Sequence, residues 1–170
     1  MTTVNTLIVF YSRYGRAEKL ALAAGVGAIR ARANIRLRRV ADFAAADTIR
    51  SDSDWQRNLD RMNMDYVVPR PADPTWADLL IFATPADHSA ELEGYIASLS
   101  SIRSMAGKIA APLAVDDSES ALKPLYVAAA SAGLIVAPAG ATAADPVARA
   151  LAYGQRVTEM ARAIKAIGTV

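Results

Sequence analysis

The chain has 170 residues and is 53% hydrophobic, which suits one globular domain with a substantial core and argues against disorder. Its 19 basic and 17 acidic side chains give a formal net charge of +2, too small an excess to indicate a nucleic-acid partner. Cysteine is absent and histidine occurs once, which excludes disulfides, thiol catalysis and a histidine-rich metal site.

The first predicted element is a buried strand over residues 6–11, which is short and rich in β-branched and aromatic side chains. A helix pattern over residues 15–32 follows at once, so the turn Ser12-Arg13-Tyr14-Gly15 joins a strand end to a helix start. Free N–H groups and the positive dipole end of a helix form an anion site, and two arginines, Arg13 and Arg16, add charge. The turn therefore predicts a phosphate site. The alternative is an ordinary turn, capped by Ser12.

The next segments are less regular. Residues 34–38 alternate between polar and apolar, which predicts a half-exposed edge strand. A short helix is expected over residues 53–65, and the three prolines between residues 69 and 74 then predict irregular structure. The long connection 40–75 is either a lid or partner surface, or a packed excursion that covers the sheet.

The second half repeats the strand–helix pattern. We expect strands over residues 79–83, 109–115 and 134–137, with helices over 91–101 and up to 132. The helix that ends at 132 starts either at a capping box of Asp116 and Glu119 or at Pro124. The last helix begins at Asp145-Pro146, a cap followed by a proline at the first helical position. Alternating buried strands and helices predict a doubly wound, five-stranded parallel α/β sheet with helices on both faces.

Two segments carry a resemblance to a known family. Residues 11–18 read Y-S-R-Y-G-R-A-E, and residues 78–85 read D-L-L-I-F-A-T-P. Both resemble the WrbA (Trp-repressor-binding-protein) type of NAD(P)H:quinone oxidoreductase, in the flavodoxin-like superfamily. There the first loop holds the phosphate of FMN, and the loop after the second segment lines the ribityl chain and the flavin ring.

The sequence departs from that family at three places. Asp87, His88 and Ser89 stand where the family has arginine, an aromatic residue and glycine. The loop after residue 115 has no glycine, whereas the family has several there. After Pro138, residues 139–144 stand in place of a long insertion that in the family covers the flavin and builds the tetramer.

The resemblance implies that residues 1–170 form one flavodoxin-like domain with strand order 2-1-3-4-5. It also implies FMN as cofactor, NAD(P)H as electron donor and a quinone or similar small acceptor. His88 and Tyr95 are the candidate groups for stacking on the ring, and His88 is the candidate catalytic residue. The expected cofactor-binding residues come from three loops: Ser12, Arg13, Tyr14, Gly15, Arg16 and Ala17; Thr84, Pro85, Ala86, Asp87 and His88; and Asp116, Asp117 and Ser118.

The departures keep a second interpretation open. A degenerate flavodoxin-like module that no longer binds FMN would act by binding another anion or a protein partner. We expect no metal site, no nucleic-acid partner and no membrane span, because no apolar run reaches the ~18–20 residues that a span requires. We also expect a homodimer and a cytoplasmic location, with which the lack of cysteine is compatible.

Overall fold

The computed structural model describes residues 2–87, 90–139 and 145–168 of the chain. The sheet consists of β1 (Val4–Phe10), β2 (Ala33–Arg39), β3 (Leu79–Thr84), β4 (Ile109–Ala114) and β5 (Ile135–Val136). The helices are α1 (Arg16–Arg30), α2 (Ala46–Arg50), α3 (Ser53–Asp65), α4 (Ala72–Trp76), α5 (Ala90–Ser98), α6 (Glu119–Ser131) and α7 (Pro146–Ile167).

The five strands form one parallel sheet in the order β2-β1-β3-β4-β5. The predicted doubly wound α/β sheet, with its order 2-1-3-4-5, is confirmed. β1 lies between β2 and β3, so the connections from β1 and β3 run in opposite directions along the sheet. In such sheets the loops at the carboxyl ends of these two strands diverge and leave a crevice between them.

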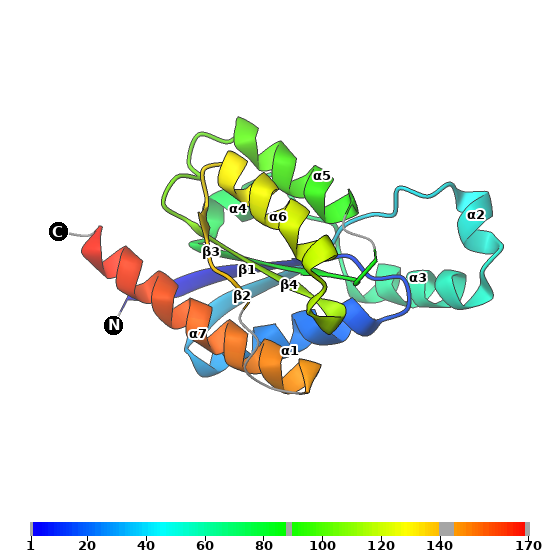
Figure 1. Cartoon of the computed structure of the whole chain (residues 1–170), viewed down its shortest axis with the longest axis horizontal. Coiled ribbons are helices and arrows are strands. Elements are labelled where there is room, and N and C mark those ends of the chain that lie inside the picture. The colour runs from blue at the N-terminus through cyan, green and yellow to red at the C-terminus, as the bar shows by residue number, and fades with distance from the viewer. Residues whose placement is uncertain (1, 88–89, 140–144, 169–170) are drawn as a thin grey trace.

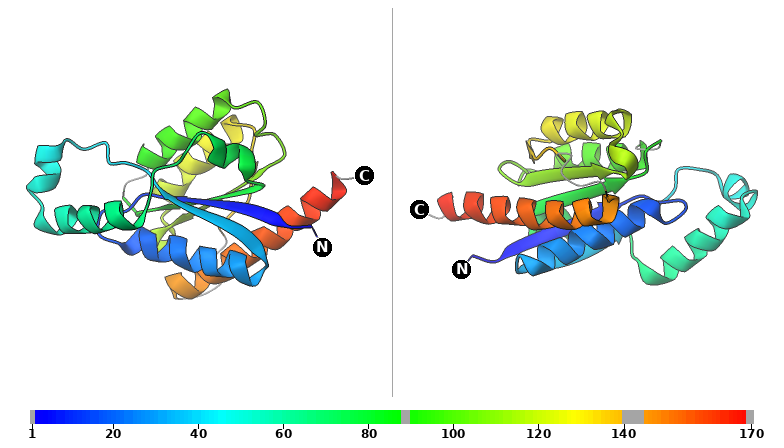
Figure 2. Two further views of the ribbon diagram at one scale, coloured as in Figure 1. Left: turned by 180° about the vertical axis from the view of Figure 1, so that it is seen from behind. Right: turned by 60° about the horizontal axis from the view of Figure 1, so that its bottom comes forward.

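Helices cover both faces of the sheet (Figures 1 and 2). Side chains alternate along each strand, so Ile8 and Ile81 pack with α1 and α7, whereas Leu7 and Leu80 pack with α5 and α6. The central strands are buried on both faces, which explains why they read as continuous apolar runs. β2 is partly exposed, as the alternating pattern predicted for an edge strand.

The connection between β2 and β3 begins with an excursion beyond the carboxyl end of the sheet, which carries α2 and α3, and it returns to the sheet at α4 (Figure 1). The predicted helix over residues 53–65 is confirmed as α3. The expectation of irregular structure around the three prolines is wrong in part, because α4 contains Pro74. Pro74 is the third residue of α4, where the backbone N–H has no partner within the helix and its loss costs little.

The helix α6 starts at neither predicted position. Its N-cap is Ser118, and Pro124 lies inside the helix. Asp116 belongs instead to a short 3₁₀ turn over residues 115–117. α7 begins as predicted, with the Asp145 carboxylate accepting the N–H of Ala148 at 2.7 Å.

The two ends of the described chain are joined at the amino edge of the sheet. Lys165 of α7 donates to the Thr3 carbonyl oxygen at 3.0 Å, and Arg162 donates to that of Thr2 at 3.3 Å. Figure 1 shows both ends on the side away from α2 and α3. No helix in the described ranges combines the length and the apolar character needed to cross a membrane.

Candidate functional site

A cavity of about 290 Å³ opens at the carboxyl ends of β1, β3 and β4. Its walls come from the loop after β1, the first turn of α1, the loop after β3 and the residue that follows β4. The lining residues are Ser12, Arg13, Tyr14, Arg16, Ala17, Pro85, Ala86, Asp87 and Val115. Segments far apart in the sequence therefore meet in one crevice, at the switch point of the sheet.

The loop after β1 is shaped by Ser12 and Gly15. The Ser12 side chain is buried, and its Oγ accepts the Gly15 N–H at 3.0 Å. Gly15 caps α1 with φ +85°, a left-handed conformation that glycine adopts without steric cost. The N–H groups of Arg16, Ala17 and Glu18 open α1 and have no carbonyl partners within it. This loop therefore presents backbone donors to an anion.

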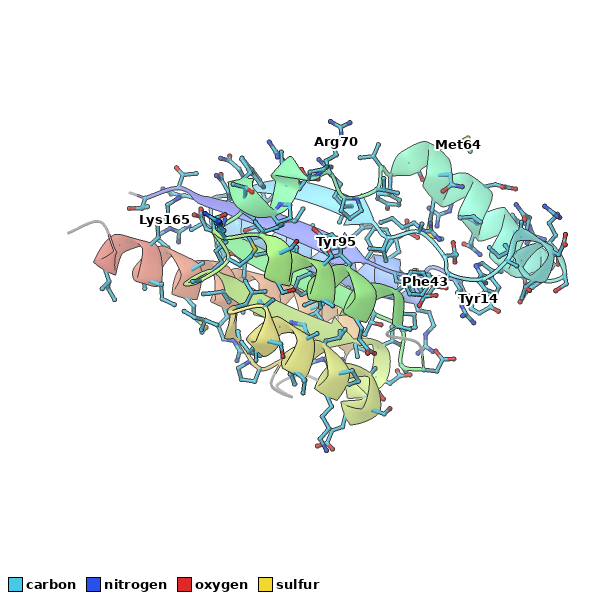
Figure 3. The ribbon with its side chains drawn as sticks, turned by 90° about the horizontal axis from the view of Figure 1, so that it is seen from above. Tyr14, Phe43, Met64, Arg70, Tyr95 and Lys165 are labelled. Atoms are coloured by element: carbon cyan, nitrogen blue, oxygen red, sulfur yellow. The ribbon has the colours of Figure 1, made fainter. Side chains whose placement is uncertain are left out.

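Two side chains of the same loop turn toward the excursion. The Arg13 guanidinium stacks 4.2 Å from the centre of the Trp55 ring and donates to the Tyr11 hydroxyl at 2.9 Å. The Tyr14 hydroxyl donates to Asp52, the N-cap of α3, at 2.6 Å. Figure 3 shows Tyr14 at the excursion end of the molecule. Arg13 and Tyr14 thus line the cavity while their polar ends are engaged outside it.

Asp42 is the centre of the buried contacts beneath the excursion. Its carboxylate accepts from the Tyr11 hydroxyl at 3.0 Å, from the Trp55 indole N–H at 3.0 Å and from Arg39. The side chains of Arg39 and Asp42 are both about 95% buried, so each compensates the charge of the other where water has little access. Burial raises the pKa of Tyr11 well above its usual range, so the phenol stays protonated and can donate.

Glu18 lies in the first turn of α1 but does not face the cavity. Its buried carboxylate accepts from Arg61 of α3 at 2.9 Å and from the Tyr66 hydroxyl at 2.6 Å. Burial alone would raise the pKa of Glu18, but these two hydrogen bonds outweigh it and the pKa lies below its usual value. The Glu18 charge is therefore compensated by the excursion and does not compete with an anion at the helix start.

The loop after β3 contributes three lining residues, Pro85, Ala86 and Asp87. Thr84 is fully buried at the end of β3 and does not line the cavity. His88, the candidate catalytic residue, lies outside the described residues. Tyr95 does not reach the cavity, since its ring packs edge-on against Phe82 at a centroid distance of 6.4 Å and joins the core beneath α5 (Figure 3).

The loop after β4 departs most from the expected site. Asp116 and Ser118 do not line the cavity, whereas Val115 does, and the side chain of Asp117 lies outside the part of the structure that is described. The Asp116 carboxylate pairs with Arg16 through two contacts of 3.0 and 3.1 Å, and Ser118 Oγ lies 2.6 Å from Ser120 Oγ. Val115 was missed because it reads as the last residue of a buried strand.

The residues of the excursion that contact the loop after β1 were also not identified from the sequence. Asp42, Asp52 and Trp55 touch the loop through side chains that are separated from it by about 30 to 40 positions. Asp52 carried one local signal, as an N-cap candidate before the helix 53–65. Nothing in the spacing indicated its contact with Tyr14.

Comparison with known proteins supports the fold assignment. No family model matches the chain. The chain is 29% identical over 151 residues to an NAD(P)H dehydrogenase (quinone) from Deinococcus radiodurans, an alignment that covers 82% of this chain and 74% of that protein. Among solved structures, an archaeal flavodoxin superposes with a TM-score of 0.62 at 13% identity, covering 93% of this chain and 99% of its own. Diflavin flavoprotein A3 from Nostoc sp. superposes with a TM-score of 0.60 at 13% identity over 99% of both chains. The fold is flavodoxin-like.

Proposed function

We propose that the protein is an FMN-dependent oxidoreductase that uses NAD(P)H to reduce a quinone or a similar small acceptor. The observation that carries the proposal is the loop after β1 with the start of α1, residues 12–18, which presents backbone N–H groups to an anion and is called the cradle below. The cradle shares one cavity with the loop after β3. The similarity to a quinone-reducing dehydrogenase supports the choice of reaction.

The donor set of the first loop fits a phosphate monoester. The open N–H groups at the start of α1 supply neutral donors aligned with the helix dipole, and Arg16 supplies a full positive charge beside them. The buried Ser12 fixes the loop by accepting the Gly15 N–H. In this proposal Arg13 and Tyr14 act through their backbone, because their side chains are held by the excursion.

Pro85, Ala86 and Asp87 would flank the polyol chain, in the same cavity as Val115 and Ala17. The cavity volume of about 290 Å³ lies at the lower end of the range for small-molecule sites, so the aromatic part of a flavin would lie at its mouth. When bound, the flavin supplies the hydride chemistry, and the protein supplies binding, orientation and charge. Two like charges a few Å apart and partly exposed cost on the order of 1–4 kcal/mol, so Asp87 in the cavity lining would disfavour the reduced, anionic form of a bound flavin.

A second candidate function is favoured by the loop after β4. Asp116 has φ +63° and a charged side chain at a place where close approach of a ring favours glycine. Its carboxylate also engages Arg16. A module that binds a smaller phosphate compound in the same cradle, without flavin chemistry, accounts for both features.

The test is a flavin titration of the purified protein. We expect FMN fluorescence to be quenched with saturation at micromolar FMN, and the reconstituted protein to oxidise NAD(P)H when a benzoquinone is supplied. Riboflavin is the control, because it has the same ring without the phosphate, and it should bind at least tenfold more weakly. Absence of quenching at several hundred micromolar FMN would rule out the flavoenzyme and leave the second candidate.

The proposal includes a homodimer and a cytoplasmic location. The exposed apolar residues Leu22, Val26 and Ile29 of α1 lie with Ile35 of β2 along a groove of about 150 Å³ at the edge of the sheet. Such a surface is typical of subunit contacts. Sedimentation at tens of micromolar protein tests this part, and a monomer at that concentration contradicts it.

A further inference from the structure

We infer that the Arg16–Asp116 ion pair is a latch across the cradle, and that Asp116 thereby lowers the affinity of the site for ligands that carry a phosphate. The inference rests on the proposed function, whose cradle it regulates. Asp116 does not line the cavity, but it acts through Arg16, which does.

The latch joins two loops that come from distant parts of the chain. Arg16 is the first residue of α1, and its Nη2 atom lies 3.0 and 3.1 Å from the two carboxylate oxygens of Asp116. Asp116 reaches this position from the turn that follows β4. Arg16 lines the cavity and is the charged group that would face a phosphate. Because Arg16 already pairs with Asp116, its charge is engaged before any ligand binds.

The backbone at Asp116 favours this arrangement. Its φ of +63° lies in the left-handed region of the backbone. Residues other than glycine, asparagine and aspartate rarely adopt this region. Asparagine tolerates this region as well as aspartate does. A change of Asp116 to asparagine therefore removes the charge without imposing new strain on the turn.

The latch is weak enough to open. The side chains of Arg16 and Asp116 are 67% and 56% exposed, and an ion pair in such a setting changes an equilibrium constant by roughly two- to fivefold. A phosphate that binds the cradle must displace the Asp116 carboxylate from Arg16. Removing that carboxylate should strengthen phosphate binding by about the same two- to fivefold, and should leave ligands without a phosphate unaffected.

The experiment compares Asp116→Asn, Arg16→Gln and the double variant with the unaltered protein at one fixed, low ionic strength. Asp47→Asn is the matched control, because Asp47 forms an exposed pair with Arg50 on α2 and its change alters the net charge equally. The first readout is the shift of the Arg16, Ala17 and Glu18 amide resonances on titration with inorganic phosphate. The second is fluorescence quenching of FMN and of riboflavin.

We expect Asp116→Asn to bind inorganic phosphate and FMN two- to fivefold more tightly and riboflavin unchanged. In the Arg16→Gln background the same change should have little effect, because the latch acts through Arg16. The latch is overturned if Asp116→Asn gives no gain, if the gain persists without Arg16, if Asp47→Asn gives the same gain, or if no variant binds phosphate. Failure of the flavin proposal is separate, since the protein would then bind phosphate but not FMN.

Discussion

Gly27 of α1 and Gly154 of α7 lie where these two helices touch backbone to backbone. A Cβ atom on Gly27 would come within 2.0 Å of the Leu151 carbonyl oxygen, and one on Gly154 within 2.1 Å of the Ala24 carbonyl oxygen. Backbone atoms cannot yield as the end of a side chain can. These two glycines therefore allow α1 and α7 to lie close together on one face of the sheet. This packing also positions the start of α1.

We predict that Gly27→Ala and Gly154→Ala each destabilise the protein by about 1–3 kcal/mol, because overpacking outweighs the gain in helix propensity. Urea unfolding measures the change. Gly25→Ala is the control in the same helix, since the nearest atom to its added Cβ is the flexible end of Ile8 at 3.1 Å. Equal effects at positions 25 and 27 would contradict the close contact.

A second prediction concerns the left-handed glycine of the cradle. Gly15→Val should reduce the affinity for FMN and for inorganic phosphate by tenfold or more, because a β-branched residue resists φ +85° and shifts the loop. Gly133→Val is the matched control, with φ +82° and no atom of the described residues within 4 Å of its added Cβ. Both variants should lose about 2 kcal/mol of stability, and only the first should lose affinity. Retained affinity in Gly15→Val would mean that the cradle is elsewhere.

A third prediction concerns the pH dependence that Glu18 confers. Its pKa is lower in the folded chain than the ordinary value of 4.5, so its contribution to stability is present above about pH 4.5 and is lost as the pH falls through the folded pKa. Glu18→Gln should cost about 1–2 kcal/mol at pH 7, where it leaves Arg61 without its buried partner. The difference between the two proteins should shrink in acid. Denaturant titrations at pH 7, 5 and 3.5 test this, and a constant difference would contradict it.

A fourth prediction concerns the attachment of the excursion. Asp42→Ala should destabilise the contact between α3 and the first loop by about 3–5 kcal/mol, because it leaves the buried Arg39 uncompensated and removes the acceptor for Trp55. Faster hydrogen exchange in α3 and a red-shifted tryptophan emission are expected. Asp65→Ala, which removes an exposed partner of Arg61, should change neither.

Much of the fold was predictable because its signals are local. Buried apolar runs marked β1, β3 and β4, and the Asp145-Pro146 pair marked the start of α7. The proline-rich segment was misjudged because a proline in a first helical turn costs little. The backbone of the first loop was equally readable, as a serine and a glycine between a strand and a helix.

The directions of the loop side chains were not predictable. Arg13 and Arg16 look alike in the sequence, yet one stacks on Trp55 and the other pairs with Asp116. Both partners come from elements that are distant in the sequence, since Trp55 lies on α3 and Asp116 follows β4. Side-chain choices of this kind depend on tertiary contacts and leave no periodic signal.

The hydrogen bonds that join α7 to the first residues of the chain have a practical consequence for engineering. Because Lys165 and Arg162 bind the backbone carbonyl groups of Thr3 and Thr2, shortening α7 to a residue before Arg162 would also release the segment that leads into β1. The last turns of α7 therefore have to be kept in any variant that is meant to preserve the start of this strand.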